Sequence, residues 1–205
     1  DHDMTLDYYD PGGEAAKPVI LVLPILGGSY HISEKFARYF AQNGYAAVLV
    51  HRQKIYKDDA GFENLDSTLR QIICDHRQVI DWVEMRPELD KARIGVFGVS
   101  MGALKASLVT ALDPRVKAGV LGLVAGDIPY IVAHSDEPGV AKRRKRLMAE
   151  KGMDAAEFQR HLASAITCDP MNYAPYMNAE NVMMILAWFD NAMPYSRGKR
   201  LWEKM

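Results

Sequence analysis

The stretch ARIGVFGVSMGALKASLVTAL, residues 92–112, decides the fold. Its first eight residues form a largely apolar run, which predicts a strand buried on both faces of a parallel sheet. Its last twelve residues predict the helix that follows. Between strand and helix stands Ser100, flanked two residues away on each side by Gly98 and Gly102. We therefore predict a tight strand-to-helix turn with a serine at its tip.

The G-x-S-x-G spacing in this context favours a catalytic nucleophile. A serine on so tight a turn adopts a strained backbone, and side chains two residues away would collide with the adjacent strand and helix. Gly98 and Gly102 remove that crowding. The helix start offers free N–H groups, so the amide of Met101 can stabilise an oxyanion. The alternative is that the glycines only allow close helix packing and Ser100 is an N-cap.

Strands and helices alternate on both sides of this turn, with short connections. Apolar runs predict strands at residues 4–9, 17–24, 46–51 and 118–126. Helical periodicity predicts helices at residues 33–44, with Ser33 as N-cap and Gly44 as the stop, and at residues 65–84. The order indicates an α/β fold with a mainly parallel central sheet and helices on both faces.

The alternation breaks at about residues 128–180, which we interpret as a helical cap insertion within a single domain of residues 1–205. The basic block at residues 142–146 is interpreted as a solvated helix face rather than an anion or membrane contact. The apolar residues of the insertion either form a substrate pocket or pack the cap: Met148, Phe158, Met171, Tyr173 and Tyr176. A strand at 182–189, with Trp188 and Phe189 in the core, and a helix at 196–205 complete the prediction.

These motifs together resemble those of α/β-hydrolases over nearly the whole chain, and within that superfamily the serine carboxylesterase and dienelactone-hydrolase-like branch. The likeness rests on LVLPILGGSY at residues 21–30, GVSMG at residues 98–102, the helical insertion and ILAWFDNAMP at residues 185–194. Dienelactone hydrolases themselves hold a cysteine in place of the serine at the strand-to-helix turn. Ser100 departs from them there, so their substrate is a poor guide.

The resemblance implies a second oxyanion amide in the loop after residues 19–23. Gly27 and Gly28 let the backbone of this loop approach a ligand, and Leu26 is the expected donor, with Ile25 as the alternative. The competing interpretation is an ordinary glycine-containing link between a strand and a helix. Tyr30 and His31 follow closely and are candidates to line the pocket.

Serine hydrolases of this superfamily also use a carboxylate, which orients the catalytic histidine. We expect this acid at the carboxyl end of a later strand, where ligands gather in open parallel sheets. Asp190 fits best, because it follows residues 182–189 and the next residues resemble the turn after the aspartate in relatives. Asp127, at the end of the preceding strand, is the alternative acid. Either carboxylate could instead cap the helix that follows it.

No histidine follows Asp190, although the order in this superfamily is Ser, Asp, His. Three interpretations are open: a fragment that lacks its last strand and helix, a catalytically dead relative, or a displaced histidine among His51, His76, His134 and His161. We favour the fragment, with the histidine roughly 15 to 40 residues beyond Met205. The 205-residue chain is then expected to hydrolyse esters poorly.

Composition favours small-molecule chemistry. A net charge of -1 gives no chain-wide attraction for nucleic acid, and two isolated cysteines suggest neither a disulfide framework nor a zinc site. No apolar run approaches the length of a membrane span, and we expect a cytoplasmic protein without metal or cofactor. The predicted function is hydrolysis of a carboxylic ester through an acyl-enzyme. The alternatives are a thioesterase, peptidase or acyltransferase of the same fold, or a non-catalytic binding protein.

Overall fold

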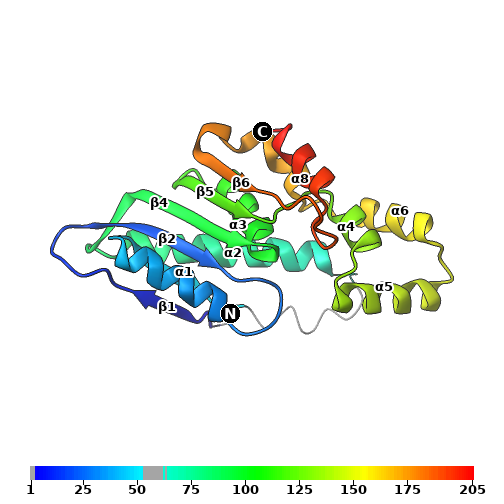
Figure 1. The fold of residues 1–205 in the computed structure, drawn as a ribbon, viewed down its shortest axis with the longest axis horizontal. Helices are drawn as coiled ribbons and strands as arrows, with labels where there is room; N and C mark the ends of the chain where they lie inside the picture. The colour runs from blue at the N-terminus through cyan, green and yellow to red at the C-terminus, as the bar shows by residue number, and fades with distance from the viewer. Residues whose placement is uncertain (1–2, 53–61, 63) are drawn as a thin grey trace.

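A computed structural model describes residues 3–52, 62 and 64–205 of the chain. Within these residues, six strands form one sheet in the order β1-β3-β2-β4-β5-β6, in which β1 is antiparallel to β3 and the other neighbours are parallel (Figure 1). The strands are β1 Leu6–Tyr9, β2 Lys17–Leu23, β3 Ala46–Val50, β4 Leu89–Val99, β5 Val116–Gly122 and β6 Val182–Ile185. The predicted α/β fold class is confirmed.

Some helices pack on the faces of this sheet, and others lie beyond the ends of its strands. The helices are α1 His31–Gln42, α2 Leu65–Glu84, α3 Met101–Leu112, α4 Ile128–His134, α5 Pro138–Lys151, α6 Ala155–Ala165, α7 Pro170–Tyr173, the 3-10 turns η2 Ala174–Tyr176 and η3 Ala179–Asn181, and α8 Tyr195–Trp202. The predicted bounds of α2 and α3 are correct. Helix α1 begins at His31, two residues earlier than predicted, so Ser33 lies buried in its first turn and does not cap it. Gly44 has φ +85°, as expected of a residue that ends a helix.

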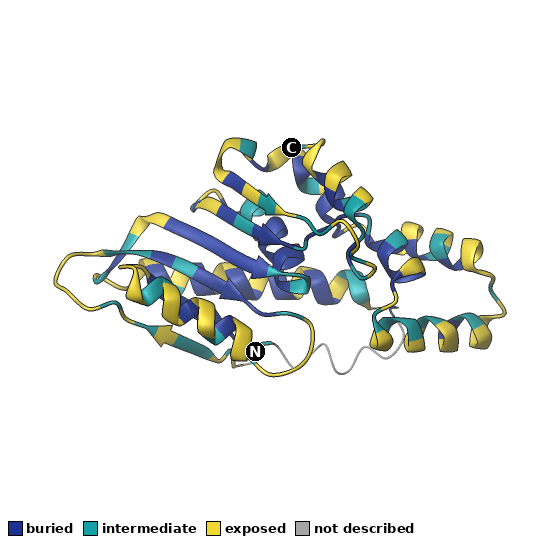
Figure 2. Cartoon of the chain, in the orientation of Figure 1, coloured by how far each residue is buried: buried dark blue, intermediate teal, exposed yellow. Residues whose placement is uncertain are grey.

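The side chains of the central strands alternate between two apolar layers. Val19, Leu21 and Val48 pack in the larger core with α2 and α3. Val22 and Leu49, on the opposite face, pack with α1. Figure 2 shows the central strands β2, β3, β4 and β5 and the helix α3 as largely buried, and the outer face of α1 and parts of the edge strands β1 and β6 as exposed. This two-sided burial explains why the strands read as continuous apolar runs.

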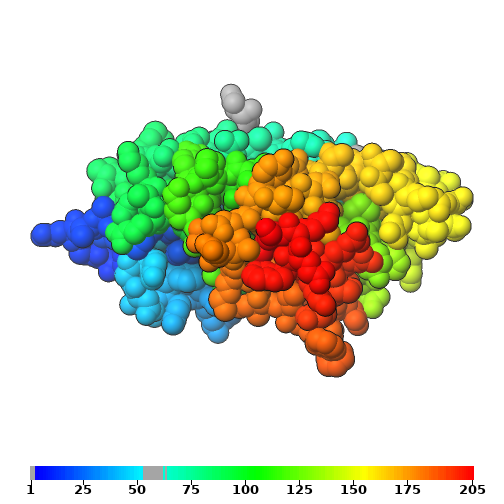
Figure 3. All heavy atoms as spheres, turned by 90° about the horizontal axis from the view of Figure 1, so that it is seen from above, coloured from blue at the N-terminus to red at the C-terminus, as the bar shows by residue number. Residues whose placement is uncertain are grey.

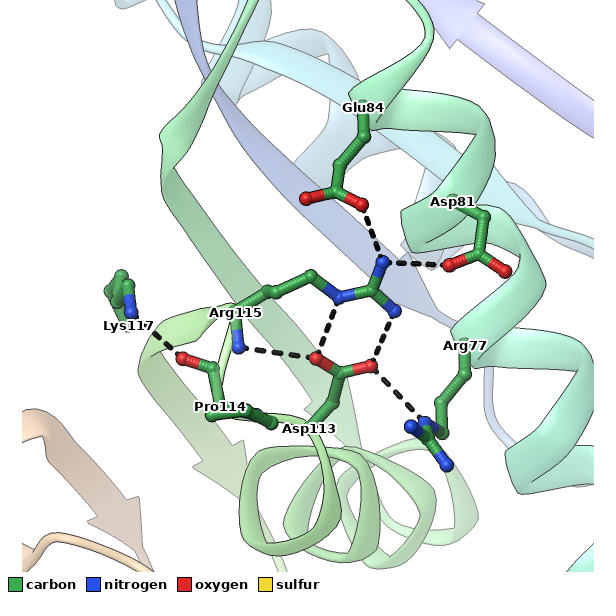
Figure 4. Close-up of polar contacts among 7 residues, drawn as sticks. All are labelled: Arg77, Asp81, Glu84, Asp113, Pro114, Arg115 and Lys117. Carbon is green, nitrogen blue, oxygen red and sulfur yellow. Dashed lines mark hydrogen bonds and ion pairs between the residues drawn. The ribbon is translucent and has the colours of Figure 1, made fainter.

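The end of α3 is fastened to α2 by a network of charged groups (Figure 4). The Asp113 carboxylate, 1% exposed, accepts from Arg115 Nε at 2.9 Å and Nη2 at 2.7 Å and from Arg77 Nε at 3.2 Å. Arg115 Nη1 also donates to Asp81 at 2.6 Å and to Glu84 at 2.7 Å, both on α2. The turn between α3 and β5 is therefore held to α2 through two arginines, Arg77 on α2 and Arg115 in the turn.

The helices α4, α5 and α6 lie beyond the carboxyl ends of the parallel strands (Figure 1). The guanidinium of Arg144 ties α5 to the end of α4, because Nη1 donates to the carbonyl oxygens of Val132 at 3.0 Å and Ser135 at 2.9 Å. The other four residues of the basic block are exposed, which agrees with a solvated helix face. The later helix α7 and the turn η2 contact α3.

The last strand is shorter than predicted and ends at Ile185. Trp188 and Phe189 are 69% and 89% exposed, so their assignment to the core was wrong. Met183 and Ile185 on β6 are also largely exposed. In the view of Figure 3, the orange and red C-terminal segments, which include the loop after β6 and α8, lie on the surface at the centre of this face. None of the helices in the described ranges is long and apolar enough to cross a membrane.

Candidate active site

The turn between β4 and α3 places Ser100 in a strained backbone conformation. Its φ is 54° and its ψ is -122°, a region that residues other than glycine rarely occupy. The turn is fixed on both sides, because the amide of Ser100 donates to the carbonyl oxygen of Gly122 at 2.8 Å and its carbonyl accepts from Leu104 at 3.0 Å. Strain of this kind persists only where surrounding contacts enforce it.

Both neighbouring glycines are sterically required. A Cβ on Gly98 would lie 2.3 Å from the carbonyl carbon and oxygen of Gly102. A Cβ on Gly102 would lie 2.1 Å from the carbonyl oxygen of Leu23, at the end of β2. These contacts involve backbone atoms, which cannot move aside as a flexible side chain can. The glycines thus permit the close approach of α3 to the sheet that the sequence suggested.

The hydroxyl of Ser100 has no structural task in helix capping. The residue stands at the N-cap position of α3, but its side chain makes no capping hydrogen bond. The residue is half-buried and borders a cavity of about 400 Å³. Met101, the first residue of α3, borders the same cavity. A hydroxyl beside a helix N-terminus and open to a cavity has the placement that a nucleophile needs.

The loop after β2 is organised by Arg52, which follows β3. Its guanidinium donates to the carbonyl oxygens of Ile25 at 3.1 Å and Gly27 at 2.9 Å, and also to that of Gly28. Its backbone amide donates to the hydroxyl of Tyr30 at 2.9 Å, and the guanidinium lies 4.3 Å from the centre of that ring. Arg52 therefore holds three carbonyl groups of this loop, those of Ile25, Gly27 and Gly28, on one side.

This arrangement orients the amide of Leu26. In a trans peptide the N–H points opposite to the preceding C=O, so the Leu26 N–H points away from Arg52 when the Ile25 oxygen points toward it. The residue itself is 38% exposed and borders the cavity that contains Ser100. Gly28 has φ +74°, which explains the need for glycine there. These contacts therefore fix the backbone of the loop after β2, beyond its role in connecting β2 to α1.

Asp190 lies in the loop between β6 and α8. Its Oδ1 accepts from the amides of Ala192 and Met193, both at 2.8 Å. Those two residues border the Ser100 cavity, so the turn that Asp190 stabilises forms part of the cavity wall. Oδ2 has no hydrogen-bond partner among the residues that the structure describes.

Asp127, the alternative acid, is held in a different set of contacts. It caps α4 by accepting from Tyr130 at 3.4 Å, and its Oδ2 binds Arg197 Nη1 on α8 at 3.0 Å. Its amide donates to Asp169 Oδ1 at 3.0 Å. Asp127 has φ +68° and, like Asp190, is not among the described residues that border the Ser100 cavity. Its carboxylate thus takes part in helix capping and in an ion pair.

None of the histidines within residues 3–52 and 64–205 borders the cavity. His76 is fully buried in α2, and burial together with the nearby Lys105 charge lowers its pKa to about 3, which makes it a poor base at neutral pH. His51 binds Asp7 at 2.7 Å, and His134 stacks on Tyr130 at 4.1 Å between ring centres. His31 is exposed at the start of α1.

The sequence pattern of the dienelactone hydrolase family matches residues 8–122, more than half of the chain. The chain belongs to this family. The match includes the turn at Ser100, the loop after β2 and Arg52, and it ends before α4. The matched residues contain strands β2 to β5 and the turn at Ser100, whereas α4, α5 and β6 lie outside them.

One curated relative, thiohydrolase apmlB of Arthrinium phaeospermum, is 29% identical over 136 residues, which are 65% of this chain and 41% of the relative. The chain thus spans less than half the length of that relative. Among solved structures, an acetyl xylan esterase from Paenibacillus sp. R4 aligns with 98% of this chain and 70% of its own at a TM-score of 0.75 and 20% identity. An acylaminoacyl peptidase of Pyrococcus horikoshii aligns with 99% of this chain and 32% of its own at 0.68 and 18%. These structural likenesses show the α/β-hydrolase fold.

Two features of this dienelactone hydrolase family member escaped the sequence analysis. The first is Arg52, although a basic residue directly after a buried strand is a usable signal, since that edge of a parallel sheet carries ligand contacts. The second is the cavity wall. None of the five apolar insertion residues proposed for it is among the described residues that border the cavity, and Phe158 and Met171 are buried in the core instead.

The described residues contain no group of three or more His, Cys, Asp or Glu side chains that could hold a metal ion. Lys105, in the middle of α3, is 1% exposed, and burial followed by the charge of Arg52 lowers its pKa to about 7. Lys105 does not border the cavity. The chemistry available at the cavity therefore centres on the hydroxyl of Ser100 and on the neighbouring backbone amides.

Proposed function

We propose that the chain is the catalytic domain of a serine esterase that works through an acyl-enzyme. The observation that carries the proposal is Ser100, held at φ 54° and ψ -122° between Gly98 and Gly102 with its hydroxyl unused for capping and open to a cavity. Membership in a hydrolase family and an esterase among the structures that share the fold support it.

In the proposed reaction, Ser100 Oγ attacks the ester carbonyl carbon and loses its proton to a base. The electron pair of the C=O π bond moves to oxygen, and the amides of Met101 and Leu26 donate hydrogen bonds to that oxyanion. Collapse of the tetrahedral intermediate expels the alcohol, which takes up a proton, and leaves the acyl group on Oγ. Water then repeats the sequence and releases the carboxylic acid. Asp190 is proposed as the acid that supports the base.

The test is labelling of the chain with a fluorophosphonate, followed by intact-protein mass. One adduct is expected on the unaltered chain and none on Ser100→Ala, whereas Ser164→Ala, an exposed serine on α6, should label as the unaltered chain does. A folded Ser100→Ala variant that still gains the adduct, or an unaltered chain that never does, would overturn the proposal.

Added imidazole sharpens this test. Because no described histidine borders the cavity, labelling by residues 1–205 should be slow, and imidazole should accelerate it in proportion to its neutral form. Acceleration must vanish in Ser100→Ala. Fast labelling without imidazole also supports the proposal, since it means that a base acts on Ser100. Slow labelling that imidazole leaves unchanged contradicts an activated serine.

Thioester hydrolysis is a second candidate. The observation that favours it is the 29% identity with a protein named as a thiohydrolase. The same attack, oxyanion and acyl-enzyme apply, with a thiol as leaving group. Oxygen esters and thioesters of one acyl group, compared by kcat/KM in the presence of imidazole, separate the two. A ratio well above that of the uncatalysed reactions in favour of the thioester would assign the thiohydrolase.

A further inference from the structure

The cavity beside Ser100 has walls from four separate helices. Leu65 and Leu69 come from α2, Leu104 from α3, Ile131 from α4 and Val140 from α5. The hydrogen bonds from Arg144 to two carbonyl oxygens fix α5 against the end of α4. Specific contacts therefore hold this wall of the cavity in place. A concave, mostly apolar site of this volume is typical of small-molecule binding.

The charges at the cavity are few. Among its described lining residues only Glu137 and Arg143 carry charge. The Glu137 carboxylate accepts from the amide of Val140 at 2.7 Å and so caps α5, and Arg143 is exposed. Neither residue offers a buried charged partner to a ligand. The walls therefore favour an uncharged apolar group over a sugar or a charged side chain, whose polar atoms would lose hydrogen bonds to water.

The volume sets the size of that group. At about 30 Å³ for each water-sized group, a cavity of about 400 Å³ accommodates on the order of ten non-hydrogen atoms. An acetyl group would leave most of this space without contacts. Since each buried methylene gains about 0.8 kcal/mol, which is three- to fourfold in affinity, a longer chain gains much more.

We propose that this cavity binds an apolar group of about six to ten carbons, carried by the substrate next to its scissile carbonyl. The proposal rests on the proposed function, because it makes Ser100 the group that attacks that carbonyl. It assigns selectivity to α2, α4 and α5, two of which lie outside the region shared with the dienelactone hydrolase family.

Amide analogues of the substrate test the proposal without any turnover. N-methyl alkanamides place the chain on the acyl side and N-alkyl acetamides place it on the alcohol side, and both series can be titrated into the Ser100→Ala variant by calorimetry. Affinity should rise about three- to fourfold per methylene and level off near ten carbons in one series. The series that rises identifies the side. Two flat series overturn the proposal.

Two substitutions that fill the cavity from opposite walls locate the binding. Leu65→Trp on α2 and Val140→Trp on α5 change half-buried residues, so the folded state should tolerate them. Each should lower affinity for the eight-carbon amide by tenfold or more and leave the two-carbon amide unchanged. Lys142→Trp, on the same helix as Val140 but exposed and not lining the cavity, is the matched control and should bind as the parent does. Unchanged affinity in both cavity variants would overturn the proposal.

The two proposals fail in distinguishable ways. If Ser100 labels but amide affinity does not depend on chain length, the serine esterase stands and the apolar chain is wrong. If affinity rises with chain length but Ser100 never labels, the cavity is a binding site and the esterase is wrong.

Discussion

Helix α3 lies between two contrasting residues. Ser100 precedes the helix, and its backbone is strained and its hydroxyl caps nothing, whereas Asp113 follows the helix, and its carboxylate is saturated by two arginines (Figure 4). At the first end, backbone atoms of α3 and β2 nearly touch across Gly102, beside a cavity. At the second end, every charged group in the network faces an opposite charge. The difference suggests that contacts at the Asp113 end stabilise the fold, whereas the Ser100 end holds a costly geometry for chemistry.

Gly102→Ala should have the largest effect and should damage both stability and labelling. The new Cβ would lie 2.1 Å from the carbonyl oxygen of Leu23, so α3 must move away from the sheet, at a cost of about 3 kcal/mol or more in the free energy of unfolding. Urea unfolding measures this cost. Gly27→Ala is the control, because nothing lies within 4 Å of its Cβ, and it should stay within about 0.5 kcal/mol. Equal losses in both variants would refute the steric explanation.

Asp113→Ala should damage stability alone. Its carboxylate is 1% exposed, and its removal leaves Arg115 and Arg77 without this partner, so we expect a loss of about 2 to 3 kcal/mol after allowing for the exposure of both arginines. The rate of Ser100 labelling, measured well below the unfolding temperature, should not change. Lys199→Ala, which breaks an exposed pair with Glu203, should cost less than about 0.5 kcal/mol. A labelling defect in Asp113→Ala would show that the two ends of α3 are coupled.

Arg52→Met should slow labelling with little effect on the apolar cavity. Without the guanidinium, the carbonyls of Ile25 and Gly27 are free to turn, and the Leu26 amide loses its fixed direction. We expect a drop in the labelling rate of about tenfold. Arg52→Lys, which keeps a donor for these carbonyls, should be intermediate. Chain-length dependence of amide binding should persist in both, and its loss would mean that Arg52 acts only by holding the fold.

Arg52 also shows where sequence reasoning stops. The bounds of α2 and α3 follow from local signals: an apolar stripe, the proline after Arg86, and the glycines around Ser100. The contacts of Arg52 with the loop after β2 join residues more than twenty positions apart, and no local pattern encodes them. The same holds for the cavity, whose walls come from four helices. Trp188 and Phe189 show the opposite error, in which a local pattern predicts burial that the structure does not have. Apolar side chains are common on protein surfaces, so an apolar run alone does not prove that a residue is in the core.

The Asp113 network should also give stability a specific dependence on pH. Burial alone raises the pKa of Asp113, but hydrogen bonds from Arg115 and Arg77 outweigh it, so the folded-state pKa is below its usual value. The unfolded carboxyl therefore binds a proton first as pH falls, and the network's contribution, complete above about pH 4, is lost as pH passes through the folded pKa. Between about pH 4 and pH 2, the free energy of unfolding should fall more steeply in the unaltered chain than in Asp113→Asn. Parallel curves would exclude this role.

The smallest predicted effect isolates the strain at Ser100. Ser100→Ala and Ser100→Gly both remove the hydroxyl, so neither should label, but only glycine adopts φ 54° and ψ -122° without steric cost. Relief of about 1 to 3 kcal/mol of strain, less the greater entropy of glycine in the unfolded chain, should make Ser100→Gly more stable than Ser100→Ala by about 1 kcal/mol. Urea unfolding of the two variants measures the difference. The same exchange at the exposed helical residue Ser164 should have the opposite sign, because glycine is the poorer helix former. If glycine is destabilising at both positions, the turn at Ser100 carries no strain, and the contrast between the two ends of α3 reduces to their charges.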